Sequence, residues 1–216
     1  MSISRVNYVG GDAKKRAYKP DPVFPFNKGD LLFKALTAAT LSGGATAVVG
    51  SVYPASAIEA NATAEECQLA FAMGFVGVAD ERYYGNGQPG EATFNVAMAE
   101  AQKSISVCTG GLFEFDCPAK AWKSNDPVGI YATGSVSTFT ITDSQTVDTL
   151  YGTTMKLDAV IGTVAQQEAP IEQGQASQTR VVVEINPPKP AGTAPVSGSY
   201  AHSYQETEYP SSTIPH

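Results

Sequence analysis

The stretch SISVCTGGLFEFDCPAKAWKSNDPV, residues 104–128, most strongly limits what this chain can fold into. Apolar and polar residues alternate over residues 104–107 and again over residues 113–116, and two glycines separate the runs. Period-two patterning on both sides of a glycine turn predicts a β-hairpin. Proline cannot donate to a sheet ladder, so we expect the second strand to stop before PAKAW. The expected core positions of this unit are Val107, Phe113, Phe115 and Trp122.

Further strand patterns place this hairpin in an all-β domain. Runs rich in β-branched, aromatic and other apolar residues occur at 29–36, 45–53, 69–79, 134–142, 153–166 and 179–185. Two other segments have less uniform patterns. Residues 55–66 could form a short helix. Residues 91–103 fit both helical and strand spacing, and we expect a strand there. We therefore predict one body over residues 28–186, folded as a small β-barrel or a jelly-roll-like sandwich.

Charge is sparse and unevenly distributed along the chain. Charged residues make up 16% of the chain, whereas typical domains contain about 25%. Residues 1–28 carry a net charge of +4, residues 29–186 carry −10, and the remainder carries −1. An acidic body argues against a general nucleic-acid binder, because phosphate contacts need clustered Lys and Arg. Low charge suits a β-rich surface that partners cover.

The two ends of the chain differ in composition from the body. Residues 1–27 lack apolar periodicity and hold three prolines, which predicts an extended basic arm that lies against this or a neighbouring subunit, or a partly disordered leader. Residues 187–216, rich in Pro, Ser and Tyr, predict an extended or disordered tail. The candidate contact residues are aromatics of the arm and of the loop ERYYGNGQPG, namely Tyr8, Tyr18, Phe24, Phe26, Tyr83 and Tyr84.

The sequence holds no residue set that indicates an enzyme or a cofactor. Both histidines, His202 and His216, lie in the tail, where a catalytic base for a nucleophile is not expected. Acidic pairs such as Glu114 and Asp116 could serve glycoside hydrolysis or bind calcium, but a solvated charged face is the simpler interpretation. The glycine-rich stretches lack the lysine of a phosphate loop. We therefore expect no catalytic, cofactor or metal site.

Cysteine usage and the start of the chain bear on where the protein is made. Cys67, Cys108 and Cys117 are odd in number and contain no CxxC pair, so we expect buried reduced thiols, although the last two could approach each other. The start MSISRVNYVGG lacks the charged and apolar regions of a secretory leader, and no apolar run reaches the ~20 residues of a membrane-spanning helix. We expect synthesis in the cytoplasm and no membrane partner.

Several pieces of sequence follow one another in a distinctive order between Phe26 and Ile185. They are FxxGDLLF, VYPASA, FVGVADE, ISVCTGGLFEFDCPAKAWKSNDPVG, AVIGTVA and VVVEI. This succession resembles the capsid decoration, or cement, proteins of tailed phages. The arm and the tyrosine-containing tail lie outside the resemblance, and the stretch ERYYGNGQPGEATFNVAMAEAQ is an insertion relative to that family's pattern.

The resemblance implies a compact β-domain on the exterior of the virion, which staples major capsid protein subunits together without catalysis. Neighbouring copies of the chain would be further partners, as dimers or trimers. Apart from the resemblance, the +4 charge and the aromatic residues of the arm, beside a body of −10, predict that the arm acts in trans on a cement or capsid neighbour. A surface carbohydrate- or receptor-binding module, with stacking by Tyr83 or Trp122, is the second hypothesis. A metal- or carboxylate-dependent hydrolase using Glu114 is the third.

Overall fold

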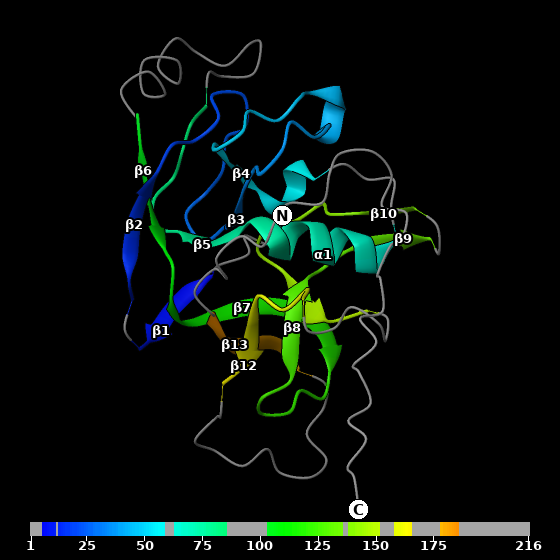
Figure 1. Ribbon diagram of the computed structural model, residues 1–216. Helices are drawn as coiled ribbons and strands as arrows, with labels where there is room; N and C mark the ends of the chain where they lie inside the picture. The colour runs from blue at the N-terminus through cyan, green and yellow to red at the C-terminus, as the bar shows by residue number, and fades with distance from the viewer. Residues whose placement is uncertain are drawn as a thin grey trace, which may run out of the picture.

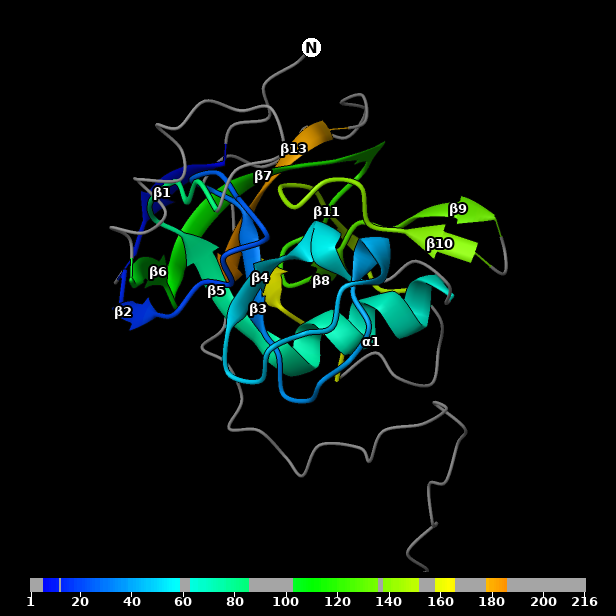
Figure 2. The same ribbon diagram turned by 90° about the horizontal axis from the view of Figure 1, so that it is seen from above.

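The computed structural model describes residues 6–11, 13–58, 63–85, 103–135, 138–151, 158–165 and 178–185. These residues are mostly β-sheet with one short α-helix, which confirms the predicted all-β sandwich. Two antiparallel sheets form the body, and a two-stranded hairpin projects from it (Figures 1 and 2). The described strands form no closed barrel, so the sandwich is the form of the prediction that the structure shows.

The larger sheet has six strands in the order β1-β7-β13-β12-β8-β11. Its longest strand, β7 (Gly111–Lys120), lies between β1 and β13. The sheet curls so that its last edge returns toward β7, where one isolated parallel bridge joins Asp116 and Thr146. We call this junction the β7/β11 seam. The other strands are β1 (Asn7–Gly10), β13 (Gln178–Ile185), β12 (Gly162–Val164), β8 (Pro127–Ile130) and β11 (Val147–Thr149).

The smaller sheet has five strands in the order β2-β6-β5-β3-β4. Its strands are β2 (Lys15–Tyr18), β6 (Ile105–Cys108), β5 (Phe75–Ala79), β3 (Leu31–Lys34) and β4 (Val52–Pro54). The projecting hairpin pairs β9 (Thr133–Ser135) with β10 (Thr138–Thr140). The helix α1 (Ala64–Gly74) lies between this hairpin and the five-stranded sheet (Figure 2).

Apolar side chains form two clusters, one on each face of the five-stranded sheet. The larger cluster joins both sheets and α1; Phe33, Phe71 and Phe115 belong to it. The smaller cluster uses the alternate positions of the five-stranded sheet, namely Leu32, Val52, Val76, Ala79, Ile105 and Val107. Phe26 and Tyr83 join it from outside the sheet. Because both faces of this sheet are covered at β3, β4 and β5, these strands read as nearly continuous apolar runs in the sequence.

The stretch 104–128 does not form a hairpin, and the prediction of one is wrong. Strand β6 pairs with β2 and β5 in one sheet, whereas β7 pairs with β1 and β13 in the other. The chain changes sheets at Gly110-Gly111, and Gly111 has a φ of 119°, a conformation that favours glycine. Alternation and paired glycines occur in a hairpin and equally at a corner between two sheets. The local pattern therefore cannot show which neighbour each strand has.

Strand β7 also continues past the proline at which it was expected to stop. Pro118 lies between the pairs Asp116–Arg180 and Lys120–Gln178, where the register of β7 and β13 shifts. An irregularity in the ladder accommodates a residue without an amide donor. The strand can therefore resume at Lys120.

The N-terminal segment, described over residues 6–11 and 13–27, pairs with its own domain instead of extending away from it. Strand β1 lies along β7 and β2 lies along β6, so the segment follows the same corner as residues 105–114 (Figure 1). Directly after β2 the chain also meets β4, at the other end of the strand order: the Val52 amide donates to the Lys19 carbonyl at 2.9 Å, and Pro20 bridges Val52. Backbone hydrogen bonds hold this pairing and most side chains of β1 and β2 are exposed, which is why the segment shows no apolar periodicity.

Helix α1 occupies the first half of the strand predicted over residues 69–79, which corrects that prediction. The helix begins with a capping box: the amide of Glu66 donates to Thr63 Oγ1 (3.3 Å) and the amide of Thr63 donates to Glu66 Oε2 (2.8 Å). The sequence Thr-x-x-Glu signals this start. The apolar run LAFAMG that follows is compatible with a strand or a helix, so only the cap distinguishes them.

Several other predictions are met in part or lie outside the described residues. Residues 55–57 form a short 3₁₀ turn. Of the predicted strand 45–53, only residues 52 and 53 lie in a strand, β4. The run 179–185 belongs to β13. Most of the predicted strand 91–103, and all of the tail 187–216, lie outside the residues that the structure describes.

Candidate interaction surface

Two of the predicted contact aromatics, Phe26 and Tyr83, are buried against each other. Their ring centroids are 5.3 Å apart, and each backbone amide donates to the carbonyl of the other residue, at 3.0 and 2.9 Å. Both side chains are about 3% exposed. They anchor the N-terminal segment to its own domain and offer no ring face to a partner.

The other predicted contact aromatics also have partners within the chain. Tyr18 is partly buried against the smaller cluster. The ring centroids of Phe24 and Tyr53 are 5.4 Å apart, and Tyr84 lies under the guanidinium of Arg82 at 4.8 Å. Tyr8 packs edge-on against Phe113, at 5.5 Å, but remains half exposed.

The four expected core residues of the 104–128 unit are all buried, although the unit is not a hairpin. Val107 belongs to the smaller cluster, while Phe113, Phe115 and Trp122 belong to the larger one. Trp122 is covered by the ammonium group of Lys120, which lies 4.4 Å from the ring centroid.

Exposed apolar side chains occur on two neighbouring loops that the sequence reasoning did not single out. Val23 is 61% exposed, Val48 is 52% exposed and Val49 is 60% exposed. We call these three residues the valine patch. Val48 and Val49 lie within the predicted strand 45–53, but Gly50 follows them with a φ of 90°, and the chain turns there.

A buried pair of polar side chains ties the two loops of the valine patch together. The Asp21 carboxylate accepts from the Val23 amide at 2.9 Å and from the Tyr53 hydroxyl at 2.8 Å. The same hydroxyl accepts from the Val48 amide at 2.7 Å. Burial, with smaller contributions from Asp21, raises the pKa of Tyr53 to about 12, so the hydroxyl stays protonated and keeps its donor. The loop positions are therefore fixed before any partner arrives.

Basic residues near the start of the chain meet an acidic residue of the body. Lys15 Nζ lies 2.7 Å from Asp80 Oδ2, and Lys28 Nζ lies 3.8 Å from Asp80 Oδ1. The hydrogen bond from Lys15 holds the pKa of the Asp80 carboxyl below its ordinary value. Part of the charge contrast between the N-terminal segment and the body is thus matched within one chain.

Replacing Lys15 with glutamine is expected to raise the pKa of Asp80 toward the ordinary value of about 3.9. A depressed folded-state pKa stabilises the fold above the unfolded-state pKa, and this contribution is lost as pH falls through the folded-state pKa. An NMR titration of the Asp80 carboxyl checks the shift. Lys14→Gln, at the neighbouring exposed position, is the control and should leave the titration unchanged; equal curves for Lys15→Gln and the parent protein would contradict the pairing.

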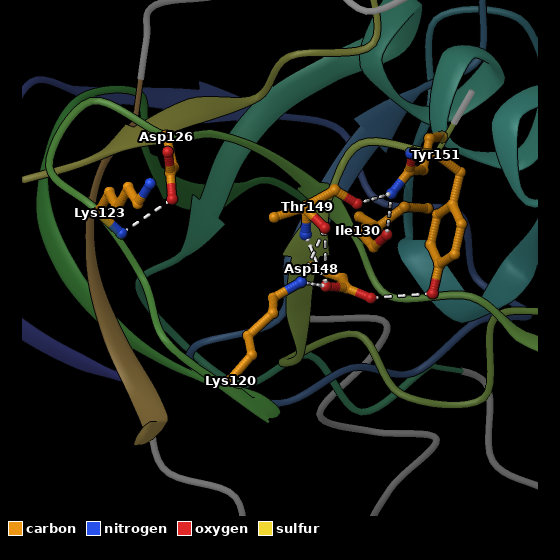
Figure 3. A network of polar contacts seen from close by, with 8 residues as sticks. Lys120, Lys123, Asp126, Ile130, Asp148, Thr149 and Tyr151 are labelled. Carbon is orange, nitrogen blue, oxygen red and sulfur yellow. Dashed lines mark hydrogen bonds and ion pairs between the residues drawn. The ribbon is translucent and has the colours of Figure 1, made fainter. Parts of the chain in front are cut away.

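A further group of polar contacts lies at the β7/β11 seam (Figure 3). Lys120 forms an ion pair with the buried Asp148 and donates to Thr149 Oγ1 at 2.7 Å. The hydroxyl of Tyr151 donates to the other Asp148 oxygen at 2.9 Å. Nearby, the buried Gln68 amide of α1 donates to the carbonyls of Ile130 and Thr149 and accepts from the Tyr151 amide. These contacts join α1, β7, β8 and β11.

Over the part of the chain that the structure describes, no three His, Cys, Asp or Glu side chains are placed to hold a metal ion, and no helix is long and apolar enough to cross a membrane. Cys67, Cys108 and Cys117 are buried thiols, as expected, and none of them forms a disulfide. Burial raises the pKa of each thiol, that of Cys117 to about 11.

Among the described residues, the valine patch is therefore the candidate surface for contact with a partner. Comparisons of the chain with protein-family models, with curated proteins and with solved structures give no match.

Proposed function

We propose that this protein is a structural capsid decoration protein, which binds the outside of a phage head and clamps neighbouring major capsid subunits. The valine patch carries the proposal. Exposed apolar side chains that lie together mark protein contact sites on soluble domains. Since Asp21 and Tyr53 already hold the two loops in place, little conformational entropy is lost when a partner covers them.

The class of partner comes from the resemblance of the sequence, which extends from Phe26 to Ile185. Cement proteins sit on an assembled shell, where several subunits meet, so a binding surface that is rigid beforehand suits this role. Neighbouring copies of the chain, as dimers or trimers on the virion exterior, are part of the same proposal.

The second candidate, a carbohydrate-binding or receptor-binding module, has less support from the geometry. Stacking on sugar rings needs an exposed aromatic face, and the side chains expected to supply it, Tyr83 and Trp122, are both buried. For the hydrolase hypothesis, Glu114 and Asp116 both contact Arg180, at 2.9 and 3.2 Å, as residues of a charged outer face do. An aliphatic patch fits a protein partner best.

The double change Val48→Ser and Val49→Ser is expected to weaken binding to heads assembled without this protein by tenfold or more. Two desolvated side chains at the centre of an interface contribute about 2 kcal/mol or more together, and tenfold corresponds to about 1.4 kcal/mol. Cosedimentation of the protein with heads, over a range of concentrations, measures the effect. Both positions lie on an exposed loop, so the fold should be kept, which a thermal melt verifies.

Val9→Ser is the matched control, because Val9 is 55% exposed but lies on β1, away from the two loops. It should bind heads within twofold of the parent protein. Equal binding by the double variant and the control would contradict the role of the patch. Binding to unassembled capsid protein but not to heads, or glycan-dependent binding on an array, would contradict the proposed function itself.

A further inference from the structure

The β7/β11 seam joins two strands that are not neighbours in the sheet order. Its backbone connection is a single bridge between Asp116 and Thr146. Just beyond the bridge, the side chains of Lys120 on β7 and Asp148 on β11 meet directly (Figure 3). Side-chain contacts therefore hold most of the seam together, whereas backbone hydrogen-bond ladders join the neighbouring strands of the rest of the sheet.

The surroundings bring one amine and one carboxyl group into a partly enclosed site. Asp148 is 5% exposed, whereas the Lys120 side chain is 30% exposed. Lys120 Nζ lies against the Trp122 ring and Thr149 Oγ1. Both oxygens of Asp148 are occupied: Oδ1 accepts from Lys120 and from the Thr149 amide at 2.6 Å, and Oδ2 accepts from the Tyr151 hydroxyl. The two reacting groups are therefore held together and oriented by three neighbours.

We propose that Lys120 and Asp148 condense to an intramolecular amide bond that locks the β7/β11 seam. One proton first passes from Nζ to the Asp148 carboxylate, so that an amine faces a carboxylic acid. Nζ then attacks Cγ of Asp148, the new Nζ–Cγ bond forms, and the bond from Cγ to Oδ2 breaks. Of the three protons on the ammonium group, one stays on the amide nitrogen and two leave with Oδ2 as water. Atoms and charge balance without any further reactant, since an ammonium and a carboxylate give a neutral amide and one water.

Two neighbours are placed to assist this step as positioning residues. The Thr149 amide donates to Oδ1, which becomes the amide oxygen, so it can stabilise the negative charge that gathers there during attack. The Tyr151 hydroxyl donates to Oδ2, the leaving oxygen, and can relay a proton to it. Burial and the hydrogen bond to Asp148 raise the pKa of Tyr151, which keeps that proton in place.

Two physical effects favour the amide over the ion pair. A carboxylate and an ammonium that are taken out of water lose hydration, and a neutral amide removes both charges. Groups held in contact react with effective concentrations far above those of the same groups free in solution. An ion pair that never reacts is the alternative, and it differs from the amide in mass.

The test is the intact mass of the purified full-length protein, followed by peptide mapping. The amide makes the chain lighter by one water, about 18 Da, and a tryptic digest should contain one branched peptide that joins the Lys120 region to the Asp148 region. The map is needed because water or ammonia can also be lost at other positions. Lys123→Arg changes a nearby lysine and should keep the loss, whereas Lys120→Arg and Asp148→Ala should show their full masses.

Tyr151→Phe tests the positioning role by a readout that stability alone would not move. The fraction of branched peptide in freshly refolded protein should rise more slowly with time than in the parent protein, with Lys120 and Asp148 unchanged. A parent protein with its full mass and no branched peptide would overturn the proposal, even if every variant failed to fold. This result would leave the proposed function untouched, because no step above depends on a capsid.

Discussion

Replacing Gly77 with alanine is expected to lower the free energy of unfolding by more than about 4 kcal/mol. Gly77 has a φ of 137°, and a Cβ at this position would overlap the carbonyl oxygen of Cys108 and lie 2.9 Å from its carbonyl carbon. Both atoms belong to the backbone of β6, which is paired to β5, so neither can move without breaking the sheet. Urea denaturation followed by circular dichroism measures the loss.

Gly43→Ala is the matched control for this prediction. Gly43 also has a positive φ, of 79°, but nothing lies within 4 Å of a Cβ placed there. Only the cost of the left-handed conformation applies, about 1 to 2 kcal/mol. Similar losses for the two variants would show that the close approach of β5 and β6 at Gly77 is not as described.

Removing residues 2–27 is expected to abolish cooperative unfolding. The deletion takes away one edge strand from each sheet, β1 and β2. It also removes Phe26 from the smaller cluster and the Asp21 carboxylate that accepts from the Tyr53 hydroxyl beneath the valine patch. Strands β6 and β7 would each lose a paired neighbour on one side. A thermal melt without a transition, together with loss of near-ultraviolet circular dichroism, is the expected result.

Two point variants separate the loss of packing from the loss of the whole segment. Phe26→Ala should cost about 3 to 5 kcal/mol because the ring is buried, and Phe24→Ala should cost clearly less because its ring is only partly buried. If the shortened protein unfolds with the same midpoint as the parent, the N-terminal segment is a detachable arm and its pairing with β6 and β7 is wrong.

The sequence predicted the class of the fold because alternation and β-branched runs are local signals. It could not predict the partners of β6 and β7, since two glycines serve a turn or a corner equally well. The start of α1 was readable in Thr63 and Glu66, but the prediction followed only the apolar run after them. For the N-terminal segment, pairing through the backbone of edge strands leaves no trace in side-chain periodicity.

The candidate surface was harder to predict than the fold. Aromatic residues such as Phe26 and Tyr83 signal contact, but the contact lies within the chain, and only the three-dimensional arrangement shows it. The valines at 48 and 49 looked like strand residues, because exposure depends on a turn at Gly50 and not on residue type. Lys120 and Asp148, 28 residues apart, are brought together by the curl of the sheet alone.

Electron cryomicroscopy of heads that carry this protein tests the proposed function most directly. The account predicts density for the β-sandwich on the outside of the shell, with Val23, Val48 and Val49 against a major capsid subunit and with the N-terminal segment paired to β6 and β7 of the same copy. Density in which the valine patch faces solvent while another surface contacts the shell, or heads with no added density at saturating protein, would contradict it.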